Sequence, residues 1–568
     1  MMQPRLQSYT HDGATMTSPH IRPYGILLFL CGVLFFSALG ALNLTDNDEG
    51  SNAGAPREML ERGDWVSPTL NGEPRFAKPV FTYWLIGASY LVFGVNEFAA
   101  RFPSAVFGTL LILMQYWFLS RVATVNVAWW SALCLLLNLE MLAIGRMVLT
   151  DMVLIFFTTL TLFSFWIAFS AEGREKRWYL VCYVATAGAM LTKGPVGVIV
   201  PLLVVLVFVL LTQNFRKVIR EARPFAGVVL FCCLALPWYG AMLMIHGDTY
   251  LESAQANTLG RYASIIGGHG GTIFFYIPVL LLGFLPWSGF LPLALRDAVS
   301  NFKAHRTAGG RGQSLFVFAA CWFVVVFLFF TLSATRLPHY IAPLFPAAAI
   351  LVAFPIARLM SGEARPKATS AFWIIVVLGM VLGGSLAVFP FVYGQLVEFI
   401  AKEFPMAGSV DPGIGISIIG MAMFIGFVAT AFFGIVAKRV RMAIRIAAVT
   451  IGLSALLIIH VGLPIFDKHF LSRPHVLASL AGDCIGADDA LVVYGRTKPS
   501  YVFYARHKII FTHKGHRAPL DRLINEGRAI TLMTQERLLP ELPADLQQLP
   551  LVKAVSGYVL LSERTCGT

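Results

Sequence analysis

Acidic residues at the edges of apolar segments are the first candidates for chemistry in this chain. Asp48 and Glu49 follow the first long apolar segment, and Asp151 opens a later one. A carboxylate in such a place can take a proton from an attacking hydroxyl or orient an electrophilic carbon. The plain alternative for Asp48 and Glu49 is a pair of solvated loop acids, or an N-cap for the helix that follows.

Single basic residues share this kind of position along the chain. They are Lys78, Arg101, Arg146, Lys193, Arg261 and Arg336. Each one alone could simply extend its charged end to the membrane surface. Ionisable groups at the edge of hydrocarbon are costly unless they are paired or hydrated, and one shared aqueous cavity would satisfy the whole set. Cations in that cavity would bind phosphate oxygens and stabilise charge on a leaving phosphate.

These residues together predict a reaction on an anionic lipid. The sequence contains no Walker motif, Gly-rich phosphate loop, GxSxG or HExxH motif, so nucleotide hydrolysis has no visible apparatus. An activated donor carried in the membrane is then the natural substrate. No CxxC or His/Cys spacing indicates zinc, and a divalent metal would lack a clear ligand set. The sequence therefore indicates no particular cofactor and leaves a divalent metal open.

The elements that position these residues are membrane-spanning helices. Apolar residues make up 57% of the chain and charged residues only 13%, against about 25% charged residues in a soluble domain. The mean hydropathy is +0.70. Apolar runs near the ~20-residue length that crosses hydrocarbon predict about thirteen transmembrane helices. They fall at roughly 24–43, 99–120, 126–144, 150–171, 178–192, 195–212, 225–246, 272–294, 314–333, 340–357, 371–393, 414–437 and 446–465.

Lys/Arg clusters in alternate connections predict the orientation. Each of five segments carries three or four basic residues: Arg174–Arg177, Arg216–Arg223, Arg296–Arg311, Arg358–Lys367 and Lys438–Arg445. Short loops of this kind stay in the cytoplasm. The N-terminus, with Arg5 and Arg22, is then inside, and an odd number of spans places the C-terminus outside. The formal charge of +13 is mostly this signal, and without a basic aromatic stripe it does not indicate nucleic acid.

Polarity divides the chain into two expected domains. Residues 1–466 hold the membrane spans and begin with an uncleaved anchor, because the first apolar segment is longer than a usual signal sequence. Within this domain, residues 44–97 form an external loop. Its stretches 55–62 and 80–93 predict two helices along the membrane surface, since the second is too short to cross.

Residues 467–568 are polar and predict a small periplasmic α/β domain. Strand-like runs fall at 490–494, 508–511, 529–533 and 558–561, and helix-like runs fall at 499–506 and 519–525. Cys484 and Cys566 lie in this domain and could form a disulfide if the compartment is oxidising. The other six cysteines lie within predicted helices, where we expect small packing residues.

Short segments, in order along the chain, carry a resemblance to a known family. They are Asp48-Glu49, Arg57–Leu60, Gly63-Asp64-Trp65, Phe76–Pro79, Tyr83-Trp84, Phe93–Ser104, Leu149-Thr150-Asp151, Leu191–Gly194, Leu285-Pro286-Trp287 and Leu337–Tyr340. The ordered set resembles the GT-C glycosyltransferases that use polyprenyl-phosphate sugars. It is similar above all to the bacterial lipid A aminoarabinose transferases and the wider group related to protein O-mannosyltransferases.

The resemblance implies both a fold class and a reaction. The fold would be an α-helical polytopic membrane protein with the GT-C fold, about thirteen helices and a periplasmic α/β domain. The enzyme would move a sugar, aminoarabinose or a similar pentose or hexose, from undecaprenyl phosphate to lipid A or another periplasmic acceptor, with inversion. It would be a monomer of the bacterial inner membrane, in contact with membrane lipids and not with nucleic acid.

The resemblance also implies roles for individual residues. By match, the expected acids of the active site are Asp48, Glu49 and Asp151, and the expected ligands of the donor phosphate are Lys78 and Arg261, with His269 following in the same stretch. The shared aqueous cavity adds Arg101, Arg146, Lys193 and Arg336 as expected ligands of substrate or phosphate. Two departures from the family pattern matter. Ala77 stands where these transferases usually have Glu, and Ala256-Asn257 stands where they tend to have Glu-His. A metal or sugar contact that relies on that Glu and His is therefore in doubt.

Two other functions stay open at the level of the sequence. Transfer to a hydroxyl, as in protein O-mannosylation or O-antigen-type transfer, would require Asp48 as a general base, whereas a lipid A phosphate is already an anionic nucleophile. A lipid-linked sugar transporter or flippase would place its binding groups near the bilayer midplane, often in repeated halves. The ionisable residues here cluster at one edge and no repeat is apparent, which favours an enzyme.

Overall fold

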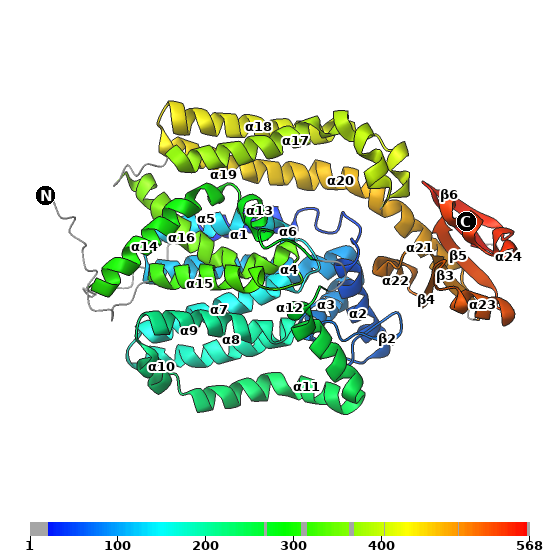
Figure 1. Cartoon of the computed structure of the whole chain (residues 1–568), viewed down its shortest axis with the longest axis horizontal. Coiled ribbons are helices and arrows are strands. Elements are labelled where there is room, and N and C mark those ends of the chain that lie inside the picture. The colour runs from blue at the N-terminus through cyan, green and yellow to red at the C-terminus, as the bar shows by residue number, and fades with distance from the viewer. Residues whose placement is uncertain are drawn as a thin grey trace.

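The computed structural model describes residues 21–265, 270–307, 315–362, 369–402, 404–486 and 488–564. A long bundle of helices occupies one end of this part of the chain, and a small sheet occupies the other (Figure 1). Between them lie α2 (Asp48–Arg62), α3 (Phe81–Phe93) and α22 (Pro499–Ala505), where the external loop meets the C-terminal region (Figure 1).

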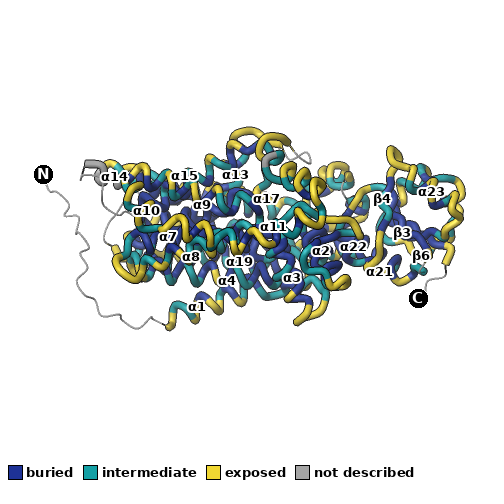
Figure 2. Tube along the Cα trace, turned by 90° about the horizontal axis from the view of Figure 1, so that it is seen from below, coloured by how far each residue is buried: buried dark blue, intermediate teal, exposed yellow. Residues whose placement is uncertain are grey.

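Apolar helices form the bundle and pack along one another. Their bounds are α1 (Ile21–Cys31), α4 (Glu97–Val122), α5 (Val125–Leu136), α7 (Asp151–Ser170), α8 (Trp178–Lys193), α9 (Val196–Leu211), α11 (Pro224–Gln255), α15 (Leu315–Thr331) and α16 (Phe345–Ser361). Buried residues follow the interior of the bundle, and exposed ones lie along its outside (Figure 2). Outward residues such as Val228 and Met244 of α11 are apolar, as expected for a face that meets lipid.

Seven of the described helices are long and apolar enough to cross a membrane, or eight if the bent pair Tyr276–Gly283 and Trp287–Ser300 counts as one span. Five shorter apolar helices accompany them: Ile21–Phe36, Phe81–Phe93, Val125–Leu136, Val196–Leu211 and Leu315–Thr331. The prediction of a polytopic α-helical membrane protein is confirmed. The number thirteen stays a prediction.

Two of the predicted spans contain a break in the helix, and their crossing of the membrane stays a prediction. In the first, α5 ends at Leu136, and Asn138 accepts a hydrogen bond from Met141 N at 3.0 Å to begin α6 (Leu139–Ile144). In the second, α13 (Tyr276–Gly283) is followed by a bend of 110° before α14 (Leu291–Thr307). Both runs stay apolar on average across their turns, although Asn138 and Pro286 lie within them, so hydropathy alone does not reveal the breaks.

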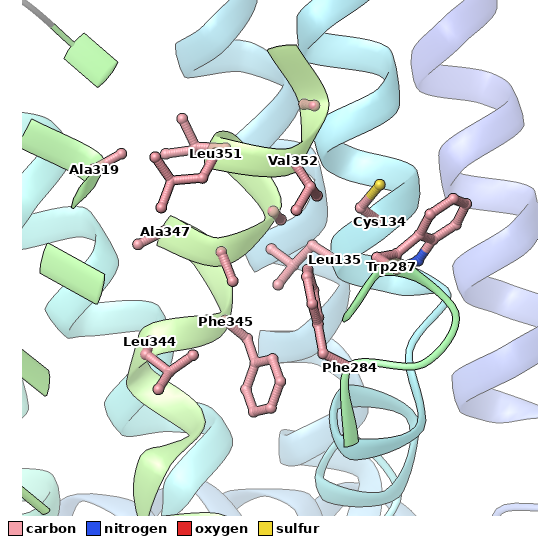
Figure 3. Close-up of a cluster of buried hydrophobic side chains, with 14 of the residues drawn as sticks. Cys134, Leu135, Phe284, Trp287, Ala319, Leu344, Phe345, Ala347, Leu351 and Val352 are labelled. Atoms are coloured by element: carbon pink, nitrogen blue, oxygen red, sulfur yellow. The ribbon is translucent and has the colours of Figure 1, made fainter. Parts of the chain in front are cut away.

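The two breaks contact each other inside the bundle. Trp287 is fully buried, and its indole Nε1 donates a hydrogen bond to the carbonyl of Leu137, which the end of α5 leaves free, at 2.7 Å. Phe284 packs against Phe345 of α16, with ring centroids 5.5 Å apart (Figure 3). Tertiary packing therefore satisfies the backbone where the helix stops. One result is that α6 and its single acid, Glu140, lie at the end of the bundle where the candidate site forms.

A second layer of helices lies along one side of the bundle (Figure 1). It consists of α17 (Thr369–Ala401), α18 (Gly413–Ala431) and α19 (Val440–Leu457). After α19 the chain stays helical through α20 (Leu463–Phe466) and α21 (Ser472–Cys484). The C-terminal region is thus joined to the membrane part by helix and not by a loose linker.

The C-terminal region is a five-stranded sheet with helices. Its strands are β3 (Ala490–Tyr494), β4 (Ile509–Thr512), β5 (Ile530–Gln535), β6 (Leu551–Val555) and β7 (Tyr558–Ser562), in the order β4-β3-β5-β7-β6. The pairs with β3 are parallel, and those with β7 are antiparallel. The predicted α/β character is confirmed. The edge strand β6 was not predicted, because its residues are mostly exposed and lack an apolar alternation.

α21 and α22 pack against one face of this sheet, and α23 (Ala518–Asn525) packs against the other. Cys484, at the end of α21, is disulfide-bonded. Cys566 lies outside the described residues.

The external loop differs from the expected surface helices. Its first helix begins at Asp48, seven residues before the stretch predicted as 55–62, and every residue from Glu49 to Met59 is buried. Even the charged residues Arg57 and Glu58 are only 3% and 8% exposed. Charged residues of α2 thus bond to α22 and to the segment that follows α2, and the position of α2 at the membrane surface stays a prediction. A short hairpin, β1 (Thr69–Leu70) with β2 (Glu73–Pro74), links α2 to α3.

Candidate active site

Glu49 is held in a buried ion pair at the start of α2. Arg101 Nε donates to Glu49 Oε1 and Arg101 Nη2 to Glu49 Oε2, both at 2.9 Å. Val148 N, Thr45 N and Thr45 Oγ1 donate to the same carboxylate. Burial alone would raise the pKa of Glu49, but Arg101 and these hydrogen bonds lower it below its usual range. Protein donors occupy all acceptor positions of the Glu49 carboxylate, so the geometry gives Glu49 a structural role.

Arg101 and Arg146 both bind backbone carbonyls in the stretch before Asp48. Arg101 donates to the carbonyls of Leu39, Leu42 and Asn43, and Arg146 donates to those of Leu34, Phe35 and Ser37. Leu34 and Phe35 lie at the end of the first helix, where carbonyls lack helical partners, and the other four carbonyls lie in the loop that follows. The two arginines therefore shape the loop that leads to Asp48, and the structure does not bring their guanidinium groups to a ligand site.

Asp48 is partly exposed and borders a cavity of about 260 Å³. The lining residues are Thr45, Asp46, Asp48, Glu49, Glu140, Ala143, Ile144, Met147, Leu149, Pro338 and His339. Within the part of the chain that the structure describes, the carboxylate of Asp48 makes no hydrogen bond or ion pair. Its neighbour in sequence, Glu49, is fully bonded. Of the two, Asp48 is the one available to a substrate.

Glu140 is a second open carboxylate in the same cavity. It lies in the first turn of α6 and lines the same cavity as Asp48. No hydrogen bond or ion pair holds it within the described ranges. Two unpaired carboxylates on one small cavity fit hydroxyl groups or an ammonium group of a ligand.

Asp151, Lys193 and His339 form a compact group of ionisable side chains beside this cavity. Lys193 Nζ lies 2.6 Å from Asp151 Oδ1, and His339 Nε2 lies 3.9 Å from Asp151 Oδ2. The ammonium of Lys193 also lies over the ring of Tyr340, 4.6 Å from its centroid. Asp151 is 3% exposed, so this pairing stabilises a carboxylate that burial would otherwise disfavour.

Lys78 lies near this group without a bonded partner of its own. It is half-buried in the turn before α3, and among the described residues its ammonium makes no hydrogen bond or ion pair. Burial, together with the nearby ammonium of Lys193, lowers the pKa of Lys78 from 10.5 to about 7. The carboxylates of Asp151 and Asp48 act in the opposite direction. Such a site would gain most from an anionic ligand, which supplies the missing negative charge.

Arg261 completes this cluster, whereas Arg336 bonds to backbone. Arg261 Nη1 donates to Tyr340 Oη at 3.0 Å, which links it to the residue beneath Lys193. Arg336 donates to the carbonyls of Gly271 and Thr331. His269 lies outside the described residues. No group of three His, Cys, Asp or Glu side chains placed to hold a metal ion occurs in the described ranges.

The structure thus divides the predicted site residues into two sets. It gathers Asp48, Lys78, Asp151, Lys193 and Arg261 at one end of the bundle. It places Glu49, Arg101, Arg146 and Arg336 in contacts with protein.

Sequence reasoning missed Glu140, His339 and Tyr340 as site residues. Glu140 falls inside an apolar run, and an acid in such a run is itself a sign of a functional site. His339 and Tyr340 directly follow Arg336 and Leu337-Pro338, in one of the segments that carry the resemblance. Their place at the start of a span, on the same side as Asp151, is the signal that could have identified them.

A family model and several curated proteins match this chain. The model described as dolichyl-phosphate-mannose-protein mannosyltransferase matches residues 53–250. An uncharacterized protein of Aquifex aeolicus is 27% identical, over 66% of this chain and 73% of its own length. Undecaprenyl phosphate-alpha-4-amino-4-deoxy-L-arabinose arabinosyl transferases of Edwardsiella ictaluri and Yersinia pestis are 30% and 31% identical. These matches cover 60% and 54% of this chain and the same shares of the two transferases.

Solved structures share the fold over nearly the whole chain. The crystal structure of ArnT from Cupriavidus metallidurans bound to undecaprenyl phosphate has a TM-score of 0.79 at 21% identity, covering 96% of this chain and 98% of that one. The archaeal oligosaccharyltransferase AglB from Archaeoglobus fulgidus has a TM-score of 0.52 at 11% identity, covering 91% and 69%. These comparisons confirm the resemblance inferred from the ordered motifs: the chain has the fold of the GT-C glycosyltransferases and is similar to the aminoarabinose transferases among them.

Proposed function

We propose that this protein is a membrane glycosyltransferase that moves a sugar from undecaprenyl phosphate to lipid A or another periplasmic acceptor. The observation that carries the proposal is a carboxylate, Asp48, near an ammonium group, Lys78, both without a bonded partner among the described residues, in a cluster that also holds the Asp151–Lys193 ion pair. The relatives named for an undecaprenyl phosphate donor support the choice of lipid carrier. Aminoarabinose, or a pentose or hexose of similar size, is the sugar that we propose.

The proposed roles follow from which side-chain groups are occupied by protein contacts and which are available to substrate. Lys78 and Arg261 bind the donor phosphate and stabilise the charge that develops on it as it leaves. Lys193 is neutralised by Asp151 and keeps Asp151 in place. Asp48 faces the anomeric carbon and the acceptor. Glu49, Arg101, Arg146 and Arg336 support the loops that carry these groups and do not contact substrate.

The reaction that fits these roles is a single displacement with inversion. An acceptor oxygen forms a bond to the anomeric carbon, the bond from that carbon to the phosphate oxygen breaks, and undecaprenyl phosphate leaves. A phosphate of lipid A attacks as an anion, so Asp48 then orients the sugar. A hydroxyl acceptor instead gives its proton to Asp48, which acts as a general base.

Transfer to a hydroxyl acceptor, on a protein or a glycan, is the second candidate function. The match of residues 53–250 to a protein mannosyltransferase model favours it, and so does the open carboxylate of Asp48. Mass spectrometry distinguishes the two candidates. Lipid A from cells with the protein should be heavier by one sugar residue than lipid A from cells with the Asp48→Asn variant. Equal lipid A masses together with a sugar added to a protein or O-antigen would instead establish the second candidate.

We also propose that residues 1–466 form the membrane domain and that the enzyme acts as a monomer. In this proposal the cavity and residues 467–568 face the periplasm. The Lys/Arg clusters support this orientation. Lys508 is exposed, so Lys508→Cys should react with an impermeant maleimide in cells with a permeabilised outer membrane, and Arg439→Cys should not. The reverse pattern would contradict the orientation. The cysteines of the unmodified protein provide the background.

A further inference from the structure

The stretch that leads to Asp48 is bound by residues much later in the chain. Asn43 N donates to Asp467 Oδ1 at 2.8 Å, across 424 positions. Leu44 N donates to Tyr504 Oη at 2.9 Å, across 460 positions. These contacts join the loop between the first helix and α2 to α22 and the helix that precedes it. The C-terminal region is therefore in direct contact with the chain that carries the proposed catalytic carboxylate.

Asp46 receives two contacts from the start of α22. Ser500 N donates to Asp46 Oδ1 at 2.9 Å, and Lys498 Nζ lies 3.8 Å from Asp46 Oδ2. Lys498 is 8% exposed and lies beside the rings of Phe404 and Tyr501, 5.7 and 5.8 Å from their centroids. A buried ammonium group requires a nearby countercharge. Asp46 supplies it only two residues before Asp48, at the border of the same cavity.

The other side of Asp48 is fixed by close packing. A Cβ atom at Gly50 would lie 2.4 Å from the backbone nitrogen of Ser500 and 2.7 Å from its Cα, so only glycine allows this approach. Further along α2, Arg57 Nη1 donates to the carbonyls of Val502 and Phe503, both at 2.9 Å. The start of α2 is thus held by α22 before and after Asp48.

We infer that the C-terminal region positions Asp48 for transfer, and that Lys498 is the positioning residue through its contact with Asp46. The inference rests on the proposed function and deepens it. Transfer depends on the carboxylate lying within a narrow range of positions relative to the anomeric carbon. Lys78 and Arg261, which bind the donor phosphate in this proposal, lie on other elements. A loss of the Lys498 contact should therefore reduce kcat and leave the KM for the lipid-linked sugar almost unchanged.

Lys498→Met is the variant that tests this role. We expect its kcat to fall at least tenfold while KM for the undecaprenyl-phosphate sugar changes less than twofold, and we expect Lys498→Arg to restore most of kcat. Lys508→Met is the matched control, because Lys508 belongs to the same region and pairs with Glu73, but both side chains are more than 60% exposed. The control should keep the kcat of the unmodified enzyme. An unchanged kcat in Lys498→Met, or an equal loss in Lys508→Met, would overturn the inference.

A second variant covers the case in which Lys498→Met does not fold. Gly50→Ala keeps every charge but displaces the backbone at Pro499 and Ser500, so it should show the same fall in kcat with a stable KM. A rise in KM alone would instead mean that α22 acts on donor binding, against the inference.

Hydrogen exchange provides a readout that does not depend on activity. In Lys498→Met the backbone amides of residues 43–50 should exchange faster than in the unmodified protein, and in Lys508→Met they should not. If the unmodified protein transfers no sugar to any acceptor, the proposed function fails, and exchange alone decides whether Lys498 orders the loop. If the protein is active and exchange in Lys498→Met is unchanged, only the positioning role fails.

Discussion

Glu49 and Arg101 form a buried ion pair with two hydrogen bonds of 2.9 Å, which joins the start of α2 to the start of α4. The side chains are 1% and 2% exposed. Asp48, the preceding residue, keeps its carboxylate free at the cavity. Two adjacent acids thus have different environments: one fixes the helix, and the other is left for a substrate.

The Glu49–Arg101 pair should contribute strongly to stability. In Glu49→Gln the guanidinium of Arg101 stays buried without a countercharge, which should cost roughly 3–5 kcal/mol of unfolding free energy. The measurement is thermal unfolding of the detergent-solubilised protein. Glu73→Gln is the control, because its pair with Lys508 is exposed and should contribute at most about 1 kcal/mol. Equal Tm values for the two variants would show that the buried pair is not a structural support.

Asp48 should be needed for the chemical step and not for folding. Asp48→Asn keeps the size of the side chain and removes only its charge, so Tm and donor affinity should stay close to those of the unmodified protein. Transfer should fall by about 100- to 10,000-fold if Asp48 acts as a base. The assay follows transfer of labelled sugar from the lipid carrier. Retention of full activity would remove Asp48 from the mechanism.

Lys78 should make donor binding depend on pH. Its pKa is lowered to about 7 in the free protein, and a phosphate prefers the protonated form. Donor binding should therefore raise this pKa, and affinity should fall as pH rises above 7, by up to about tenfold per pH unit. Affinity is measured with the lipid-linked sugar between pH 6 and 9. The phosphodiester of the donor does not titrate in this range, so a flat profile would contradict the assignment.

Two variants separate the charge of Lys78 from its packing. Lys78→Met removes a charge-assisted contact of about 1.5–3 kcal/mol, so donor affinity should fall about 10- to 100-fold at pH 6. Lys78→Arg keeps the charge at every pH tested and should bind the donor without the decline above pH 7. A decline that persists in Lys78→Arg would have to come from another group.

Glu140 should contact the transferred sugar. Glu140→Gln removes one of the two open carboxylates of the cavity and should lower kcat/KM by about tenfold or more, because a hydrogen bond to a charged group contributes about 1.5–3 kcal/mol. If the sugar carries an ammonium group, the loss should be larger for it than for the corresponding neutral sugar. Competition between the two lipid-linked sugars measures this ratio. Equal losses would mean that Glu140 binds hydroxyl groups.

Sequence patterns predicted most strands of the C-terminal sheet, but they did not predict how the external loop packs. Four of the strands in the sheet were predicted within two residues at either end, since their apolar runs are bounded by polar turns. α2 was predicted as a surface helix because its charges suggest water on one side. In the structure these charges bond to α22 and to the hairpin, and no local pattern could indicate a partner more than 400 positions away.

The sequence by itself determined the class of the protein and the position of its ionisable residues relative to the helix ends. Crossing a membrane depends on local hydropathy, which is a property of about twenty consecutive residues. The tertiary structure decided which charges remain free. Arg101 and Arg146 bind backbone, Asp151 pairs with Lys193, and Asp48 and Lys78 stay open. Such pairing depends on distances between segments that are far apart in the chain, and these distances exist only once the helices have packed.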